Sequence, residues 1–233
     1  MSGKKVWFIT GAGRGMGVDI ARAALAAGHC VVATGRSTDA VANAVGKTED
    51  LLVAELDITS PASAGAAVHA ALDRFDRIDV LLNNAGNFFA GFFEELSPEQ
   101  FEAQLTTNLL GPFRLTKALL GSLAAAARDG RRPLVVNVSS DAAVTAYENW
   151  GAYGASKAAL QHLSRIWNLE LKGDGVSVVS IDPGDMDTAL HELAIPGADR
   201  ASLRRPEDSA HEIADLIAAH VSARARMSLE AAS

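Results

Sequence analysis

Short apolar runs alternate with longer alanine-rich segments along most of the chain. The runs, such as VWFI, LLVAEL and PLVVNV, are continuously apolar, as expected for strands that are covered by helices on both faces. Repeated alternation of this kind predicts an α/β fold with a doubly wound parallel sheet between two helical layers. We expect strands near residues 4–10, 30–34, 51–55, 79–82, 133–139 and 176–181, and helices near residues 15–27, 38–46, 60–75, 97–127, 151–172 and 206–220.

The composition and net charge of the chain indicate which classes of partner it binds. With 233 residues, 48% of them hydrophobic, the chain is expected to form a single domain over residues 1–233. Its net charge is −7 and it lacks a long basic run, so we expect no nucleic-acid or membrane partner and favour a small molecule. The single cysteine, Cys30, is expected in a strand and suits a reducing cytoplasm, which is the predicted location. No signal peptide or apolar stretch of membrane-spanning length is recognisable.

The first predicted strand ends in the glycine-rich stretch TGAGRGMG, residues 10–17, directly before a helix. Glycines at such a turn let backbone N–H groups approach the phosphates of a dinucleotide at the helix N-terminus. The spacing matches TGxxxGxG but not GxGxxG, because Met16 and Val18 stand where a third glycine would be required. No GK[ST] follows, so a Walker-type phosphate loop is excluded.

The charges near this turn indicate which dinucleotide is bound. An acidic residue after the second strand would bind the ribose hydroxyl of NAD, whereas an arginine accommodates the 2′-phosphate of NADP. Here Arg36 follows the second strand and Arg14 lies within the glycine turn, with no carboxylate at that corner. The pair favours NADP(H) over NAD(H), although Arg36 alone is equally compatible with a solvated loop charge.

The stretch YGASK places Tyr153 and Lys157 one helical turn apart, on the same helix face. On its own this pattern is more often a surface lysine near a half-buried tyrosine. Three further motifs lie at the predicted carboxyl ends of strands, where ligands bind in such sheets. They are NNAG (residues 83–86), VNVSS (residues 136–140) and DPGDMDT (residues 182–188).

In order and spacing, these five motifs resemble those of the short-chain dehydrogenase/reductase family, in its short single-domain, Rossmann-like type, over residues 4–190. The resemblance implies an oxidoreductase in which Tyr153 is the catalytic acid/base, Lys157 its partner and Ser140 the hydroxyl that holds the substrate oxygen. Ser139 is a rival for that last role. Asn108 matches a helix asparagine that supports a proton relay to the lysine, although it could merely kink its helix.

The resemblance also implies contacts with the cofactor. Lys157 would hold the nicotinamide ribose, Asp57 the adenine and Thr188 the carboxamide. The expected cofactor-binding residues are Gly11, Arg14, Gly15, Met16, Gly17, Arg36, Asp57, Ile58, Asn84, Ala85, Gly86, Tyr153, Lys157, Pro183, Gly184 and Thr188. The ammonium of Lys157 is expected to lower the pKa of Tyr153 by favouring the phenolate.

The substrate pocket is expected between residues 87–93, residues 146–153 and a lid formed by residues 185–205. Its aromatic residues favour an apolar or aromatic carbonyl compound or secondary alcohol, although at least half of these rings are expected to pack in the core. They are Phe88, Phe89, Phe92, Phe93, Tyr147 and Trp150. No metal site is expected, and three scattered histidines, His162, His191 and His211, are expected to be solvated.

Two other functions are compatible with the fold. A dinucleotide-binding regulatory module could have lost catalysis, but it would not need Ser140, Tyr153 and Lys157. Related epimerases and dehydratases usually carry TGxxGxxG and a larger C-terminal domain.

Assembly as a homodimer or homotetramer is expected through residues 97–127 and 151–172, with Leu109, Leu110, Ala158 and Leu169 as candidate contacts. A seventh strand has only a weak candidate, residues 225–229.

Overall fold

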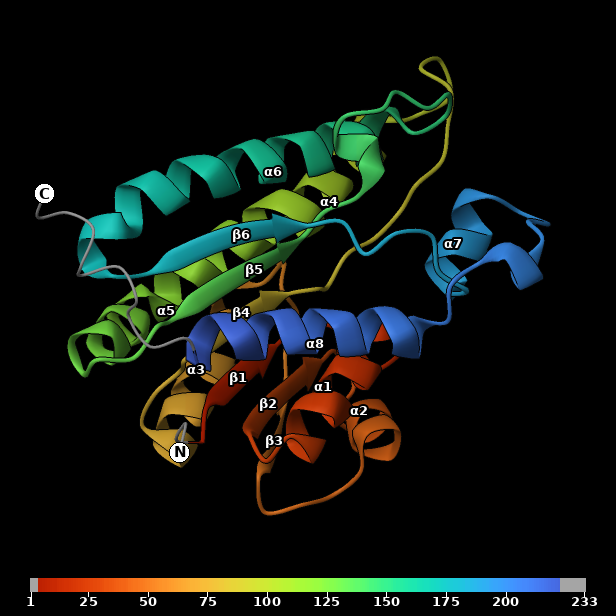
Figure 1. Cartoon of the computed structure of the whole chain (residues 1–233). Helices are drawn as coiled ribbons and strands as arrows, with labels where there is room; N and C mark the ends of the chain where they lie inside the picture. The colour runs from red at the N-terminus through yellow and green to blue at the C-terminus, as the bar shows by residue number, and fades with distance from the viewer. Residues whose placement is uncertain (1–3, 223–233) are drawn as a thin grey trace, which may run out of the picture.

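One parallel sheet of six strands organises the molecule, in the order β3-β2-β1-β4-β5-β6 (Figure 1). The computed structural model describes residues 4–222, so the candidate seventh strand at residues 225–229 lies outside the described residues. All six predicted strands are confirmed, and Cys30 begins the second of them. They are β1 (Val6–Ile9), β2 (Cys30–Gly35), β3 (Leu51–Glu55), β4 (Val80–Asn83), β5 (Leu134–Val138) and β6 (Ser177–Ile181).

Helices cover both faces of the sheet, as the continuous apolar strands require. Along β1, Trp7 and Ile9 pack with one set of helices, whereas Val6 and Phe8 pack with the other. The first face is covered by α1 (Met16–Ala26), α2 (Thr38–Val45) and α8 (Pro206–Ser222). The second is covered by α3 (Pro61–Phe75), α5 (Gly111–Arg128) and α6 (Gly151–Glu170). The predicted doubly wound fold is therefore confirmed.

The long helix expected over residues 97–127 is interrupted, which corrects that prediction. It consists of α4 (Pro98–Leu105), a π-helical turn (Thr106–Leu110) and α5. Pro112 has no N–H to donate to the carbonyl of Asn108 four residues earlier, and the N–H of Gly111 donates to Thr106 five residues earlier instead. The interruption coincides with the predicted site residue Asn108.

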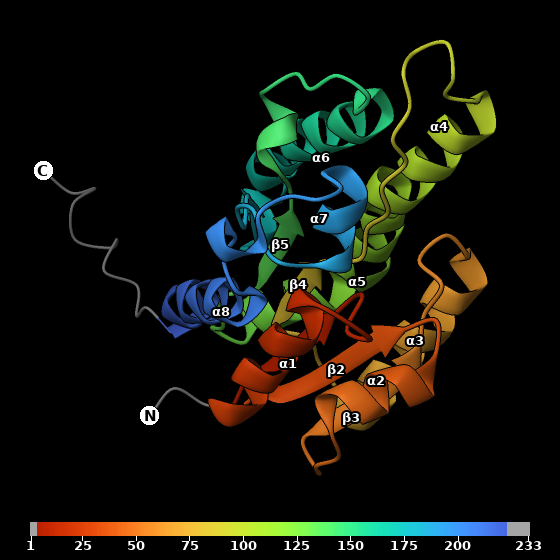
Figure 2. The same ribbon diagram turned by 90° about the vertical axis from the view of Figure 1, so that its right-hand side faces the viewer.

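The segment after β6 forms a small lobe at the carboxyl edge of the sheet. It contains α7 (Ala189–Ala194), and its two ends meet in a bridge between Met186 and Arg204. Figure 2 looks onto this edge and shows α7 over the strand ends, between α6 and α1. The predicted lid segment, residues 185–205, thus lies where the strands end. Within residues 4–222, no helix is long and apolar enough to cross a membrane.

Candidate active site

The glycine turn between β1 and α1 leaves room for a ligand at the start of the helix. Gly15 is the N-cap of α1, with a positive φ of 59°, and no side chain caps its first turn. A Cβ on Gly17 would lie 2.6 Å from Nδ2 of Asn84 and even closer to the Gly11 carbonyl oxygen, so this position requires glycine. Met16 is buried as the first residue of α1. The first turn of α1 therefore has no side-chain cap, as at helix N-termini that bind phosphate.

The NNAG motif holds the glycine turn in place. The hydroxyl of Thr10 accepts hydrogen bonds from the backbone N–H groups of Asn84 and Ala85, each at 2.9 Å. The amide of Asn84 donates to the carbonyl oxygens of Thr10 (2.9 Å) and Gly11 (3.2 Å). Two motifs that are more than 70 residues apart thus form one rigid cradle. The cradle is already formed by the protein's own hydrogen bonds.

The remaining predicted cofactor contacts surround this cradle. Arg14 and Arg36 are exposed, and the charge of Arg36 helps to lower the pKa of Asp57, after the larger effect of hydrogen bonds from Thr59. Ile58 is buried under Gly111, where an added Cβ would lie 2.6 Å from its side chain. Arg36 and Asp57 are therefore neighbours at the corner where the sequence predicts the adenosine end of the cofactor.

The DPGDMDT motif reaches the same cradle from β6. Gly184 has a positive φ of 74° and its N–H donates to the Asp182 carboxylate at 3.0 Å, while the Pro183 carbonyl accepts from Ser209 at 3.2 Å. Thr188 caps α7, and its methyl group lies 3.9 Å from the position of a Cβ on Gly15. The structure thus brings Thr188 against the glycine turn, as expected for a group that contacts the same ligand.

Tyr153 and Lys157 point from the first turns of α6 into the interior, next to the end of β5. Lys157 is only 6% exposed, and its Nζ donates to the Val138 carbonyl at 2.8 Å. The same Nζ lies 5.5 Å from the centre of the Tyr153 ring. A Cβ on Gly86 would lie 3.9 Å from Nζ of Lys157, so the NNAG motif approaches this pair. The solvated lysine that YxxxK alone most often indicates is not present here.

The pKa shifts of this pair are set mainly by burial. Burial raises the pKa of Tyr153 to about 12, a hydrogen bond with Ser140 opposes this rise, and the charges of Asp141 and Asp182 add to it. Burial lowers the pKa of Lys157 to about 8. The pKa of Tyr153 is thus raised overall, with burial as the largest cause. The Lys157 ammonium donates to the Val138 carbonyl and lies over the phenol ring, and the expected lowering of the Tyr153 pKa by this charge stays a prediction.

Of the two candidate serines, Ser140 is the one that reaches Tyr153. Its hydroxyl hydrogen-bonds the phenol and also donates to the Asp141 carboxylate at 2.9 Å. The Ser139 hydroxyl is buried without a hydrogen-bond partner among the described residues, and its backbone N–H continues the sheet by donating to Ile181. The structure therefore brings together Ser140, Tyr153 and Lys157 and leaves Ser139 in the sheet.

Asn108 is buried in the π-helical turn and joins three segments. Its amide donates to the Asn87 carbonyl (3.0 Å) and to the Ser156 hydroxyl (3.1 Å), and its oxygen accepts from the Asn87 N–H (2.9 Å). The oxygen would also lie 3.4 Å from a Cβ on Gly86. Asn108 therefore does more than interrupt its helix, because it fixes the loop after β4 to α6 beside Lys157.

An aromatic cluster adjoins Tyr153 and marks the substrate side. Phe88 packs edge-on against Tyr153 and Trp150, at centroid distances of 5.1 and 5.2 Å, and Tyr147 lies 4.8 Å from Trp150. From α7, Leu190 and Ala194 pack against this cluster. Phe92 and Phe93 project into solvent, with Phe93 98% exposed, and Phe89 is half-buried. The two environments predicted for the six rings, the wall of the pocket and the protein core, are therefore each observed only in part.

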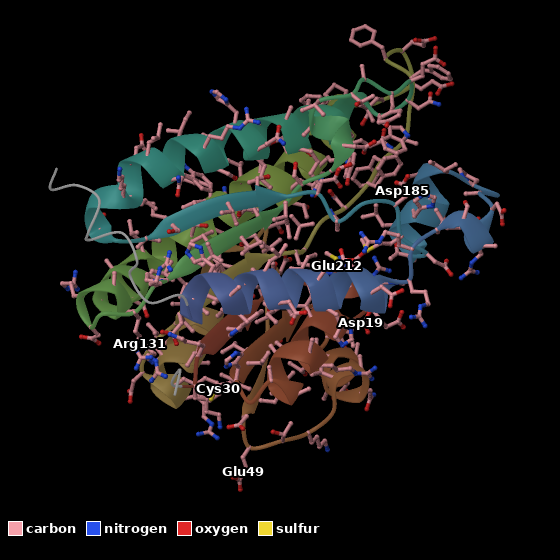
Figure 3. The ribbon with its side chains drawn as sticks, in the orientation of Figure 1. Asp19, Cys30, Glu49, Arg131, Asp185 and Glu212 are labelled. Atoms are coloured by element: carbon pink, nitrogen blue, oxygen red, sulfur yellow. The ribbon has the colours of Figure 1, made fainter. Side chains whose placement is uncertain are left out.

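One histidine differs from its expected environment. His191 is buried in α7, and its Nε2 lies 3.8 Å from the carboxylate of Asp185, whereas His162 and His211 are exposed as expected. Asp185 lies on the segment that leads from β6 into α7 (Figure 3). The folding of the lobe over α6 buries His191. Among residues 4–222, no group of side chains is arranged to hold a metal ion.

Several contacts at the site were missed by sequence reasoning. Asp141 accepts from both Ser140 and Tyr147, and Ser156 binds Asn108. Asp141 directly follows the predicted serine, so its position was a usable signal. The Ser156–Asn108 contact joins residues that are 48 apart in sequence, and no local pattern could have indicated it.

Comparison with known proteins agrees with this geometry. The family model for short chain dehydrogenases matches residues 5–198, and the chain belongs to this family. It is a family of oxidoreductases that use a nicotinamide cofactor.

Individual relatives extend the similarity over nearly the whole chain. The trans-4-hydroxycyclohexanecarboxylate dehydrogenase of Sinomonas cyclohexanicum is 33% identical over 225 residues, which cover 92% of this chain and 84% of that protein. The alcohol dehydrogenase of Thermococcus sibiricus, solved with 5-hydroxy-NADP, is 29% identical with a TM-score of 0.83, covering 95% and 94% of the two chains. The 3-ketoacyl-(acyl-carrier-protein) reductase of Brucella melitensis, solved with NADH, is 28% identical with a TM-score of 0.83, covering 96% and 93%.

Proposed function

We propose that the chain interconverts a carbonyl compound and a secondary alcohol with NADP(H) as the hydride carrier. The observation that carries this proposal is the buried Tyr153 phenol, hydrogen-bonded to Ser140 and adjacent to Lys157, next to a glycine cradle at a helix N-terminus. A binding module that only senses a nucleotide would not need this buried trio.

The cradle has the form that a dinucleotide requires. Gly11 and Gly17 let the turn pack closely against Asn84 and Ala85, a Cβ on Gly15 would meet only Thr188 at 3.9 Å, and no side chain caps the first turn of α1, so its N-terminus would accept a phosphate. The residues that would hold the cofactor are those of the glycine turn, Asn84 to Gly86, Asp57, Ile58, and Pro183, Gly184 and Thr188. Lys157 would bind the nicotinamide ribose, because its Nζ is next to the NNAG loop.

Side chains of the protein transfer the proton to and from the substrate oxygen. When bound, the reduced nicotinamide supplies hydride to the carbonyl carbon. Tyr153 donates its phenol proton to the carbonyl oxygen, and Ser140 forms a hydrogen bond at the same position. Asn108 holds the loop after β4 against α6 and thereby supports proton return toward Lys157. In the direction of alcohol oxidation, the phenolate of Tyr153 accepts the proton.

A preference for NADP(H) is supported by Arg14 and Arg36. Both guanidinium groups are exposed at the edge of the cradle, where a 2′-phosphate would be accessible to them. The carboxylate of Asp57, which lies near Arg36, already accepts two hydrogen bonds from Thr59 and has a lowered pKa. It is therefore less available to a ribose hydroxyl.

The substrate side favours an apolar or aromatic compound. Phe88, Trp150 and Tyr153 form adjoining rings, and α7 adds Leu190 and Ala194. Residues 185–205 would act as the lid, because their lobe covers this cluster. The proteins compared above include a dehydrogenase and a ketoacyl reductase, whose names describe the same pair of reactions.

Assembly as a homodimer or homotetramer is also part of the proposal. Leu110 at the start of α5 and Leu169 at the end of α6 are exposed, Leu169 by 75%, and both lie on the helices expected to pair. Ala158 and Leu109 are half-buried on the same helices. A cytoplasmic location stays a prediction.

A substrate screen tests the proposed function. The purified chain is mixed with NADPH or NADH and with matched aromatic and aliphatic ketones, and the absorbance of the reduced cofactor is followed. We expect turnover with NADPH and with ketones that carry an apolar ring. Equal efficiency with the two cofactors would contradict the NADP(H) preference, and a lack of turnover in both directions across the screen would contradict the activity.

A further inference from the structure

The Asp141 carboxylate lies at the mouth of the site, next to the hydroxyl that is proposed to hold the substrate oxygen. Its Oδ1 accepts from the Ser140 hydroxyl at 2.9 Å, and its Oδ2 accepts from the Tyr147 hydroxyl. Asp141 is half-buried and Tyr147 is exposed, so the carboxylate lies where the site meets solvent. Asp141 is thus an accessible acceptor whose position is fixed by two hydroxyl groups.

The single proton of the Ser140 hydroxyl cannot serve two acceptors at once. In the structure this proton is directed to Asp141. In the proposed reaction the same proton turns to the substrate oxygen, and Oδ1 of Asp141 then loses its donor. An acceptor that loses its donor in a partly buried site is costly to leave unpaired. A substrate that brings a donor of its own would remove this cost.

The position of Oδ1 indicates where the substrate must carry that donor. Two consecutive hydrogen bonds, from the substrate oxygen to Ser140 and from Ser140 to Asp141, separate the reacting oxygen from Oδ1 by at most about 5.7 Å. A hydroxyl or ammonium group on the carbon next to the carbonyl lies close to the carbonyl oxygen. Such a group can therefore reach Oδ1 with an ordinary hydrogen bond.

The charges at this side of the site favour the same kind of substituent. Burial is the largest cause of the raised pKa of Tyr153, and the charges of Asp141 and Asp182, which follow β5 and β6, add to it. In the lobe after β6, the guanidinium of Arg200 is paired with the Asp187 carboxylate at 2.7 Å. A neutral or positively charged donor next to the carbonyl is therefore favoured over a carboxylate, which Asp141 would repel.

We propose that the substrate is a ketone with a hydroxyl or ammonium group on the carbon next to the carbonyl, or the matching secondary alcohol, and that Asp141 binds this group. The inference rests on the proposed function and names the substrate class of the same site. Phe88 and Trp150 form the apolar side, so the apolar part of the substrate lies toward these rings and its donor toward Asp141. The product of reduction is then a vicinal diol or a vicinal amino alcohol.

Matched phenyl ketones test this preference in the unmodified chain, with the oxidation of NADPH as the readout. The α-hydroxy and α-amino derivatives of acetophenone carry the donor, and the two compounds distinguish a hydroxyl from an ammonium group. The α-methoxy derivative keeps the oxygen atom but has no proton to donate, and benzoylformate places a carboxylate next to the carbonyl. We expect kcat/KM for the better donor ketone to exceed that for the methoxy ketone by about tenfold or more, with benzoylformate the poorest substrate. A methoxy ketone or benzoylformate that reacts as well as both donor ketones would overturn the inference.

Variants of Asp141 show whether this residue causes the preference. The readout is the ratio of kcat/KM between the donor ketone and the methoxy ketone within one protein, so a general loss of activity cancels. Asp141→Leu removes the acceptor, and the ratio should fall by about tenfold. Glu148→Gln removes an exposed charge from the same loop and should keep the parent ratio. A parent ratio in Asp141→Leu, or an equal fall in Glu148→Gln, would contradict the role of Asp141.

A second variant covers the case in which Asp141→Leu does not fold, which circular dichroism would show. Asp141→Asn has the same size and keeps an oxygen that accepts from Ser140, but it removes the charge. The ratio of kcat/KM between α-aminoacetophenone and benzoylformate should fall by about tenfold or more in this variant, and an unchanged ratio would overturn the inference. Turnover of every ketone without regard to the donor would refute the inference and leave the proposed function standing. A lack of turnover with all of them would refute the proposed function itself.

Discussion

Replacing Lys157 with Met should change how stability depends on pH. Lys157 is buried, and the pKa of its ammonium is lowered from 10.5 to about 8. Between these two values the unfolded chain binds a proton that the folded chain has released. The free energy of unfolding therefore rises with pH across this window, and the destabilisation is complete below about pH 8.

The size of the effect follows from the shift. A lowering from 10.5 to about 8 corresponds to about 3 kcal/mol of destabilisation at about pH 7, which falls below about 1 kcal/mol near pH 10. Lys157→Met removes this pH-dependent destabilisation. It also leaves the Val138 carbonyl without its donor, which lowers the free energy of unfolding by about 1–3 kcal/mol at every pH. The stability of the variant relative to the parent should therefore fall by roughly 2–3 kcal/mol from about pH 7 to about pH 10.

Urea unfolding at the two pH values measures this difference. The ionisation of Tyr153 is present in both proteins and largely cancels in the comparison. Lys172→Met removes an exposed ammonium near the end of α6 and is the matched control, for which the difference should be independent of pH. If Lys157→Met behaved like Lys172→Met, the burial argument for the Lys157 pKa would be refuted.

Three further predictions concern the cradle, the cofactor and assembly. Gly17→Ala should cost about 1–3 kcal/mol of stability and weaken NADPH binding, because its Cβ would lie 2.6 Å from Asn84. Gly13→Ala should have little effect, since its Cβ would be 3.7 Å from Val41; urea unfolding and fluorescence titration compare the two, and equal effects would contradict the cradle geometry. Arg36→Asp should weaken NADPH binding by about tenfold or more and NADH binding much less, and parallel losses in titrations would argue against a phosphate contact. Light scattering at micromolar concentration should give at least twice the chain mass of 24.3 kDa, and a particle of that single mass would exclude the proposed assembly.

The fold and the position of the candidate site residues at one edge of the sheet could be predicted because their signals are local. Continuous apolar strands, the glycine spacing at residues 11–17 and the i, i+4 pair Tyr153 and Lys157 are each contained in a short stretch. The geometry of the sheet then brings these stretches to one edge. The Gly15–Thr188 contact and the clamp between Asn84 and the glycine turn follow from that topology.

Features that depend on burial and on distant contacts could not be read from the sequence. The spacing of Tyr153 and Lys157 correctly indicated that they share one helix face, but it did not indicate how deeply that face is buried from solvent. The overall rise in the Tyr153 pKa that burial causes could therefore not be predicted from the spacing. Likewise, the burial of His191 depends on how the lobe after β6 folds back. The interruption at Asn108 could have been anticipated from Pro112, which cannot continue an α-helical ladder.

Tyr153→Phe tests the central claim most directly, because it removes one oxygen and the only proton that the proposed reaction takes from this side chain. NADPH binding is measured by titration, and hydride transfer is measured in a single turnover with a ketone that the parent enzyme reduces. The account predicts a loss of about 10²-fold to 10⁴-fold in the rate of cofactor oxidation, with NADPH affinity nearly unchanged. A variant that oxidised NADPH at close to the parent rate would contradict the assignment of Tyr153 as the proton donor.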